Sequence, residues 1–240
     1  MDRAAVIRIG TSGFSYKEWQ GSFYPPKIPG SKMLAFYAER LPTVEINYTF
    51  RRMPRPELLT GWASQTPGNF RFALKAPERI THTARLRNTD NDLTRFVEIA
   101  SVLGEKLGPV LFQLPPGLKR DIPLLSDFLN LLDHRVCAAF EFRDKSWFDD
   151  SVFEALRTSG AALCIAESDK LATPIERTAP QVYVRLRKES YDDEGLRAWA
   201  GRLAGFANDG AEVFVYLKHQ TAAPGFVFRL RELTDEVARA

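Results

Sequence analysis

The sequence is poor in the residues on which many metal centres and secreted proteins depend. Its 240 residues include only two cysteines and three histidines. Cys137 and Cys164 form neither a CxxC pair nor a zinc motif, and each lies in an apolar run, so we expect buried, reduced thiols in a cytoplasmic protein. The histidines show no HxH or HExxH spacing, and we assign no metal ligand.

Several other signatures are also missing. No apolar run approaches the length of a membrane span, and the opening MDRAAVIRIG leads into a strand rather than a signal peptide. The sequence contains no GxSxG, P-loop or GxGxxG motif. The net charge of +3 permits an anionic ligand but does not by itself support nucleic-acid binding. We therefore expect no membrane association and no bound cofactor.

What the chain does contain is eight short runs rich in β-branched and aromatic residues. They begin at Val6, Thr43, Phe70, Gly108, Val136, Ala161, Gln181 and Ala211. Stretches with helical period lie at 31–41, 90–108, 121–132, 146–160, 192–210 and 225–240, with Ser31 as the N-cap of the first and Gly108 ending the second. This order predicts an α/β fold, with residues 1–240 forming a single TIM-type (β/α)8 barrel domain. An open doubly wound sheet is the main rival, but eight units and a terminal helix favour closure.

Polar side chains recur near the ends of these strands. Alternate residues of a strand face opposite sides, so one parity should pack on the helices and the other should face the lumen. On the second strand, Val44 and Ile46 face one side, and Glu45 and Asn47 face the other. The equivalent polar positions of the other strands are Lys75, Gln113, Glu141, Arg143, Glu167, Asp169, Arg185, Arg187 and Lys218. Most lie towards the carboxyl ends of the strands, where (β/α)8 enzymes have their active sites.

Cations outnumber carboxylates in this set. Five arginines and lysines accompany four carboxylates, Glu45, Glu141, Glu167 and Asp169. This surplus suits a phosphate or carboxylate on a ligand, which guanidinium groups bind in bidentate geometry. The plainer interpretation is lumen packing by ion pairs, with Lys75 paired to Glu45 or Glu141.

Several blocks of the chain resemble the DUF72 family, also called YecE-like proteins. They are IRIGTSGFSYKEW, FYP, VEINYTF, FRFALKAPERITH, LGPVLFQLPP, FEFRDKSW and YVRLR, in that order from about Ile7 to Lys218. The resemblance implies a TIM-type barrel and no established activity. It places the family's recurrent polar residues at Glu45, Asn47, Lys75, His82, Gln113, Glu141, Arg143, Trp147 and Arg185.

The chain departs from the family pattern in two blocks. The seventh strand often continues as Arg-Leu-His-Gly in the family, whereas here Arg185 and Leu186 are followed by Arg187 and Lys188. The eighth strand ends in VYLKHQ instead of a Phe-x-Asn-Asn-like block. If the missing histidine and asparagines carry chemistry, these departures imply altered specificity or reduced activity.

The candidate residues divide into two groups. We take Glu45, Lys75 and Glu141 as catalytic candidates, because a carboxylate beside a cation can act as a base and a lysine crowded by arginines has a lowered pKa. The substrate-binding candidates lie on or just after the strands: Asn47, Tyr48, His82, Gln113, Arg143, Trp147, Arg185, Arg187 and Lys218. Tyr48 and Trp147 are the aromatic residues best placed for ligand contact.

Three functions remain open. The first is an enzyme that binds a small anionic substrate, phosphorylated or carbohydrate-like, at the C-terminal face of the barrel; lyase, isomerase and hydrolase chemistry all fit. The second is a metal-dependent phosphodiesterase or nuclease with Mg²⁺ or Mn²⁺ on the four carboxylates, which the interspersed cations disfavour. The third is a non-catalytic ligand-binding or scaffold barrel.

Overall fold

The computed structural model describes residues 6–132 and 134–239, and its eight parallel strands close into a barrel in chain order. The strands are β1 (Ile7–Ser12), β2 (Thr43–Ile46), β3 (Arg71–Lys75), β4 (Leu107–Gln113), β5 (Ala138–Glu141), β6 (Ala162–Glu167), β7 (Gln181–Leu186) and β8 (Glu212–Leu217). Strand β1 pairs with both β2 and β8, with Thr11 beside Val44 on one side and Leu217 on the other. The predicted (β/α)8 barrel is therefore confirmed, and the open sheet is excluded.

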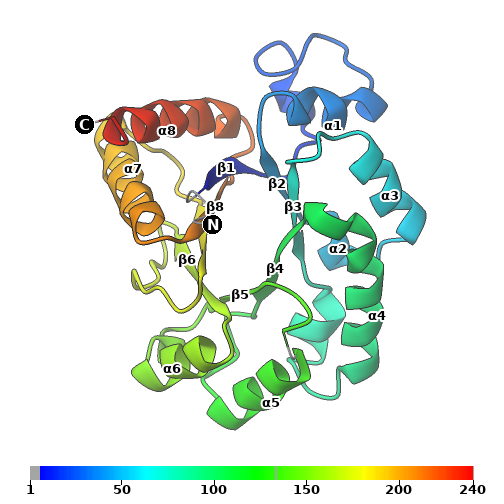
Figure 1. The fold of residues 1–240 in the computed structure, drawn as a ribbon, viewed down its shortest axis with the longest axis vertical. Coiled ribbons are helices and arrows are strands. Elements are labelled where there is room, and N and C mark those ends of the chain that lie inside the picture. Colours follow the sequence, from blue (N-terminus) through cyan, green and yellow to red (C-terminus); the bar gives the residue numbers. More distant parts are fainter. Residues whose placement is uncertain (1–5, 133, 240) are drawn as a thin grey trace.

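The helices surround the strands (Figure 1). They are α1 (Gly30–Ala38), α2 (Tyr48–Arg51), α3 (Pro56–Ser64), α4 (Asp90–Ala100), α5 (Ile122–Leu132), α6 (Asp150–Thr158), α7 (Asp193–Asn208) and α8 (Ala223–Val237). Short 3-10 helices span Lys17–Trp19, Ser101–Lys106 and Lys145–Trp147, and a π-helical turn spans Arg79–Thr83. Within 6–132 and 134–239, no helix combines the length and apolarity needed to cross a membrane.

The alternation of strand and helix departs from the prediction in two units. The connection from β2 to β3 carries α2 and α3, which the periodicity did not reveal, and residues 168–180 between β6 and β7 contain no helix. Two predicted boundaries are also wrong. Helix α1 begins at Gly30 after Pro29, so Ser31 is not its N-cap. Gly108 lies within β4, because a 3-10 segment ending at Lys106 already completes the helical stretch.

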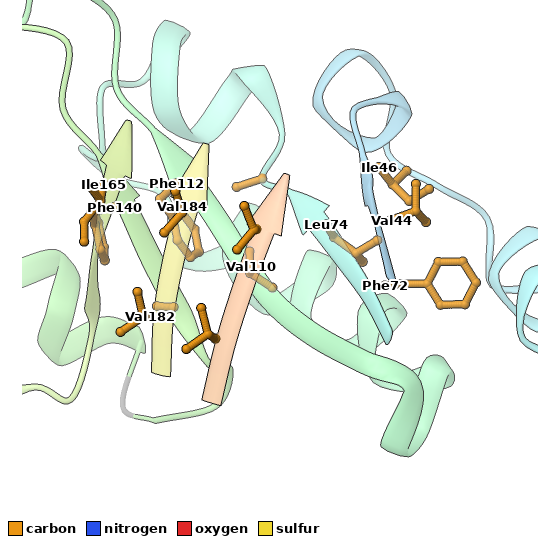
Figure 2. Packing of buried hydrophobic residues seen from close by; sticks show 14 of the residues in the cluster. Val44, Ile46, Phe72, Leu74, Val110, Phe112, Phe140, Ile165, Val182 and Val184 are labelled. Atoms are coloured by element: carbon orange, nitrogen blue, oxygen red, sulfur yellow. The ribbon is translucent and has the colours of Figure 1, made fainter. Parts of the chain in front are cut away.

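The outer faces of the strands carry the main apolar core. Figure 2 shows aliphatic and aromatic side chains from successive strands, including Val44, Phe72, Val110 and Phe140, and they belong to one buried cluster with residues of the surrounding helices. Their alternation confirms the predicted faces of β2 to β5. The polar residues between them must consequently face the lumen.

Small residues and aromatic rings fill the lumen. The second buried cluster includes Ala73, Leu111, Ala139, Ala162, Cys164, Ala166, Tyr183, Phe214 and Tyr216. On β6 the small residues face inwards, and Ile165 lies in the outer core (Figure 2). Glu167 shares the outer parity, so the predicted orientation of β6 was wrong. Side-chain bulk was a poor guide there, because alanines leave room for the rings of Tyr183 and Tyr216, whose centroids lie 5.1 Å apart.

The two cysteines have different environments. Cys164 is buried as expected, although it faces the lumen, and burial raises its pKa well above the ordinary value. Cys137 is exposed just before β5, contrary to the prediction of a buried thiol. The apolar run around it marks the start of a strand at the rim of the barrel, where alternate residues still reach solvent.

Candidate functional site

A single guanidinium connects two buried carboxylates near the carboxyl ends of the strands. Arg185 on β7 is only 2% exposed. Its Nη2 donates to Glu45 Oε1 at 2.8 Å, and its Nη1 donates to Glu141 Oε2 at 2.5 Å. The two carboxylates come from β2 and β5, so Arg185 spans the lumen. Pairing with two carboxylates is what makes such burial of charge tolerable.

Glu45 receives further hydrogen bonds from neighbouring strands. Ser12 Oγ donates at 2.5 Å, Tyr183 OH donates at 2.7 Å, and Asn47 Nδ2 lies at 3.4 Å. Burial alone would raise the pKa of Glu45, but Arg185 and these donors outweigh it and lower the pKa. Glu45 therefore stays ionised at neutral pH.

Glu141 is surrounded by donors even more completely. In addition to Arg185, it accepts hydrogen bonds from Gln113 Nε2 at 2.8 Å, Arg143 Nε at 3.1 Å and Arg187 Nη2 at 3.1 Å. Burial opposes ionisation, but the three guanidinium groups lower the pKa of Glu141 far below its usual range. A carboxylate with this many donors is a weak base, which disfavours the role of catalytic base expected for Glu141.

Lys75 has no carboxylate partner among the described residues. Its Nζ donates to Gln113 Oε1 at 2.8 Å and lies 3.6 Å from the centre of the Phe50 ring. The ion pair with Glu45 or Glu141, considered from the sequence, is not formed. Burial, followed by the charge of Arg185, lowers the pKa of Lys75 to about 8. Lys75 is thus the group in this cluster best matched to proton exchange near neutral pH.

His82 lies beside Lys75, on the π-helical turn after β3. Its ring packs edge-on against Phe50 at 4.9 Å, and its Nδ1 lies 2.9 Å from Thr81 Oγ1. Partial burial and the charge of Lys75 lower the pKa of His82, which favours the neutral ring at pH 7. The Phe50 ring therefore contacts both a cation and a neutral imidazole.

Three further cations lie at the more exposed end of the cluster. Side-chain exposure is 31% for Arg143 and 19% for Arg187, and Lys218 is exposed at the end of β8. Partial burial and Arg185 lower the pKa of Lys218. Arg185 and Arg187 each have a buried Nε without a hydrogen-bond partner among residues 6–132 and 134–239. These groups form a cationic layer above the two carboxylates.

The excess of cations is larger than the sequence predicted. Glu167 faces the helices, where its carboxylate forms an ion pair with Lys188 and accepts a hydrogen bond from Trp199 of α7. Asp169 is exposed in the segment after β6 and accepts the backbone N–H of Glu189. Five cationic side chains therefore surround two carboxylates, whereas the sequence predicted four carboxylates for the same five cations.

The structure separates two of the predicted binding residues from this cluster. Trp147 is fully buried, stacks on Phe142 at 4.6 Å and donates its indole N–H to Leu118 O at 2.7 Å. The chain turns this ring back onto the outer core, and its contact with a ligand stays a prediction. Tyr48 is 44% exposed and meets Trp62 edge-on at 6.3 Å.

Three residues of the network were not assigned from the sequence. Ser12 and Tyr183 bond to Glu45, and Phe50 covers Lys75. Parity could have identified Tyr183, which shares the inward face of β7 with Arg185. Phe50 lies in the helix after β2, where strand parity does not apply.

A cavity of about 540 Å³ opens beside this network. Its lining includes Asn47, Tyr48, Leu58, Trp62, Phe14 and Tyr16. Asn47 belongs to both features, since its Nδ2 donates to Ser12 Oγ at 2.9 Å. The polar cluster and the largely apolar cavity therefore share a wall.

The cluster does not offer a metal site of the kind considered above. Across the part of the chain that the structure describes, no group of three or more His, Cys, Asp or Glu side chains is arranged to hold a metal ion. The acceptor atoms of Glu45 and Glu141 are directed at guanidinium, hydroxyl and amide donors. The donor set fits an anion better than a divalent cation.

Comparisons with known proteins agree with this architecture. The family model described as "Protein of unknown function DUF72" matches residues 8–240. The chain is 33% identical to UPF0759 protein YecE of Escherichia coli K12 over 144 residues, which are 60% of this chain and 50% of that protein. It is 30% identical to UPF0759 protein YunF of Bacillus subtilis 168 over 158 residues, 62% of this chain and 55% of that protein. The matches thus span about half the length of these relatives.

Solved structures show the same fold. A DUF72 family protein of Thermotoga maritima MSB8 superposes with a TM-score of 0.82 at 23% identity, covering 95% of this chain and 99% of that one. A DUF72 family protein of Enterococcus faecalis V583 gives a TM-score of 0.79 at 18% identity, covering 96% of each chain.

Proposed function

The chain belongs to the DUF72 family, and for this member we propose an enzyme that binds a small oxyanion-bearing molecule at the carboxyl ends of its strands. The observation that carries the proposal is that the cluster holds five cationic side chains and only two carboxylates, whose oxygens already accept hydrogen bonds. Cations gathered at such cost in mutual repulsion need an external anion to balance them. A phosphate or carboxylate provides that charge and matches guanidinium geometry.

The depth of the charged groups supports entry of an anion. Glu45 and Glu141 are 0% exposed, whereas Arg143, Arg187 and Lys218 reach solvent. A ligand arriving from the open end meets positive charge first. The buried carboxylates hold the guanidinium groups in place from below, as positioning residues.

The proposal gives Lys75 the proton-transfer role. Its pKa of about 8 lets it exchange a proton near neutral pH, whereas both carboxylates have lowered pKa values and each of their oxygens already accepts a hydrogen bond. The amine of Lys75 can also act as a nucleophile towards a substrate that contains a carbonyl group. Lyase, isomerase and hydrolase reactions all remain compatible with a lysine in this position.

Calorimetric titration with inorganic phosphate tests the binding site. We expect saturable binding by the unmodified chain and at least about tenfold weaker binding by Arg143→Ala, because a charge-assisted hydrogen bond contributes about 1.5–3 kcal/mol. Arg157→Ala is the matched control, since Arg157 is an ion-paired arginine on the outer helix α6. Equal phosphate affinity in all three proteins would contradict the proposal.

A non-catalytic barrel is the second candidate. The saturation of both carboxylates favours it, because a fully paired lumen can exist for packing alone. Oxyanion binding without turnover of any phosphorylated or carboxylated compound would support this alternative over the enzyme.

A further inference from the structure

The cavity beside Asn47 bears on the kind of anion that the site would accept. It is lined mainly by aromatic and aliphatic side chains, and Tyr48 presents 44% of its surface to solvent. Large apolar side chains left open beside a polar cluster are typical of ligand pockets. The cavity volume of about 540 Å³ is in the range of small-molecule sites.

The rings that line the pocket pack against neighbouring side chains and backbone. Trp62 stacks on Phe72 of the outer core at 6.2 Å, and Tyr48 meets the Trp62 ring edge-on. Tyr16 donates its hydroxyl hydrogen to Ser12 O at 2.8 Å. These contacts leave ring surfaces facing the cavity while the rings themselves stay in place, an arrangement that favours stacking of a flat group.

Short chains of hydrogen bonds connect this pocket to the charged cluster. Asn47 lines the cavity and donates to Ser12 Oγ, and Ser12 donates to Glu45, which Arg185 holds. The two regions thus lie next to each other, and a molecule with its oxyanion at one end and an apolar group at the other matches their chemistry.

We propose that the ligand of this barrel is a small organic anion whose phosphate or carboxylate is attached to a flat apolar or aromatic group, with the ring in the Tyr48–Trp62 pocket and the oxyanion on the cationic cluster. This inference rests on the proposed function and narrows it. It assigns Tyr48, Leu58 and Trp62 as specificity residues for the non-reacting part of the molecule.

The test compares phenyl phosphate, methyl phosphate and phenol by calorimetry. We expect phenyl phosphate to bind at least about tenfold more tightly than methyl phosphate, because the ring adds apolar burial. Phenol, which lacks the oxyanion, should bind far more weakly than phenyl phosphate. Inorganic phosphate should compete with phenyl phosphate, as expected of one shared site.

Tryptophan fluorescence gives a second measurement on the same samples. Trp62 is partly exposed, whereas Trp19, Trp147 and Trp199 are at most 3% exposed. Phenyl phosphate should therefore change the emission of Trp62, and methyl phosphate should change it much less. Loss of the emission change in Trp62→Phe would assign the signal to this residue.

The variant Tyr48→Ala tests where the phenyl ring of the ligand binds. This exposed side chain can be removed with little risk to folding, and we expect the advantage of phenyl over methyl phosphate to fall several-fold while methyl phosphate affinity stays unchanged. Phe228→Ala is the matched control, because Phe228 is a second exposed aromatic residue, 38% exposed on α8 and outside this pocket.

The outcomes separate the two proposals. Equal affinities for phenyl and methyl phosphate would overturn the two-part ligand and leave the oxyanion site standing. Phenol binding as tightly as phenyl phosphate would also overturn it, because the pocket would then act without the cations. Absence of binding by both phosphates would overturn the proposed function together with this inference.

Discussion

Lys75 donates its hydrogen bond to the amide oxygen of Gln113, and the nitrogen of the same amide donates to Glu141. The neutral amide thus lies between a lysine and a carboxylate that would otherwise form an ion pair. Lys75 is consequently buried without a counterion, which lowers its pKa to about 8. A lysine held in this way reduces stability and gains reactivity.

Replacing Lys75 by methionine should stabilise the protein. The shift from 10.5 to about 8 corresponds to about 3 kcal/mol of unfavourable charge burial at 1.36 kcal/mol per unit. Loss of the hydrogen bond to Gln113 offsets about 1 kcal/mol of this. Urea unfolding at pH 7 should therefore show Lys75→Met more stable by roughly 1–2 kcal/mol.

Lys106 provides the matched control for that experiment. Its ammonium is partly buried and donates to the carbonyls of Ala63 and Thr66, each at 2.6 Å. Lys106→Met should lose about 1–3 kcal/mol, because two carbonyls lose a charged donor. Destabilisation by both substitutions would show that Lys75 is an ordinary structural lysine.

The stability difference between the wild-type chain and Lys75→Met should depend on pH. Between about 8 and 10.5 the unfolded chain holds the Lys75 proton and the folded chain does not, so wild-type stability rises with pH in that window. The advantage of Lys75→Met should be largest below pH 8 and should shrink as pH approaches 10.5. Parallel urea titrations at several pH values measure it, and a constant difference would refute the lowered pKa.

Glu141→Gln should be strongly destabilising at neutral pH. Arg143, Arg185 and Arg187 would lose their shared counterion, and breaking a buried pair in this way costs about 3–5 kcal/mol. The folded pKa of Glu141 is depressed, so its contribution is full above about pH 4.5 and is lost as pH falls.

Chemical unfolding at pH 7 and in acid checks both parts of that expectation. Wild type and Glu141→Gln should differ greatly at pH 7 and should converge as the pH is lowered. Glu154→Gln on the surface of α6 is the control and should change little. If Glu141→Gln lowers stability by the same amount at pH 7 and in acid, the loss would point to a packing effect.

Two tyrosines of the lumen allow a matched comparison. Tyr183 OH donates to the ionised Glu45, whereas Tyr216 OH shares a hydrogen bond with the neutral hydroxyl of Thr43. Tyr183→Phe should cost about 1.5–3 kcal/mol and Tyr216→Phe about 0.5–1.5 kcal/mol. The ranking can be read from urea midpoints, and a larger loss in Tyr216→Phe would contradict the ionised state of Glu45.

The sequence predicted the barrel and the convergence of Glu45 and Glu141, because strand parity and parallel pairing are properties of the backbone. It expected Lys75 between these carboxylates, where the structure has Arg185. It was wrong about Glu167, since β6 fills the lumen with alanines and turns its bulky residues outwards. It did not reveal that Trp147 stacks on Phe142, because a position after a strand end does not determine where a ring packs. The partner of Lys75 depends on the side-chain conformation of Gln113, which no periodicity specifies.

Calorimetric titration with inorganic sulfate between pH 7 and 9.5 tests the central claim most directly, because the charge of sulfate stays constant over that range. An anion on the cationic cluster favours protonated Lys75, so affinity should fall by about tenfold or more as pH rises well above 8. Lys75→Met should bind weakly at every pH, without this dependence. Absence of sulfate binding, or a pH dependence unchanged in Lys75→Met, would contradict an oxyanion site that includes Lys75.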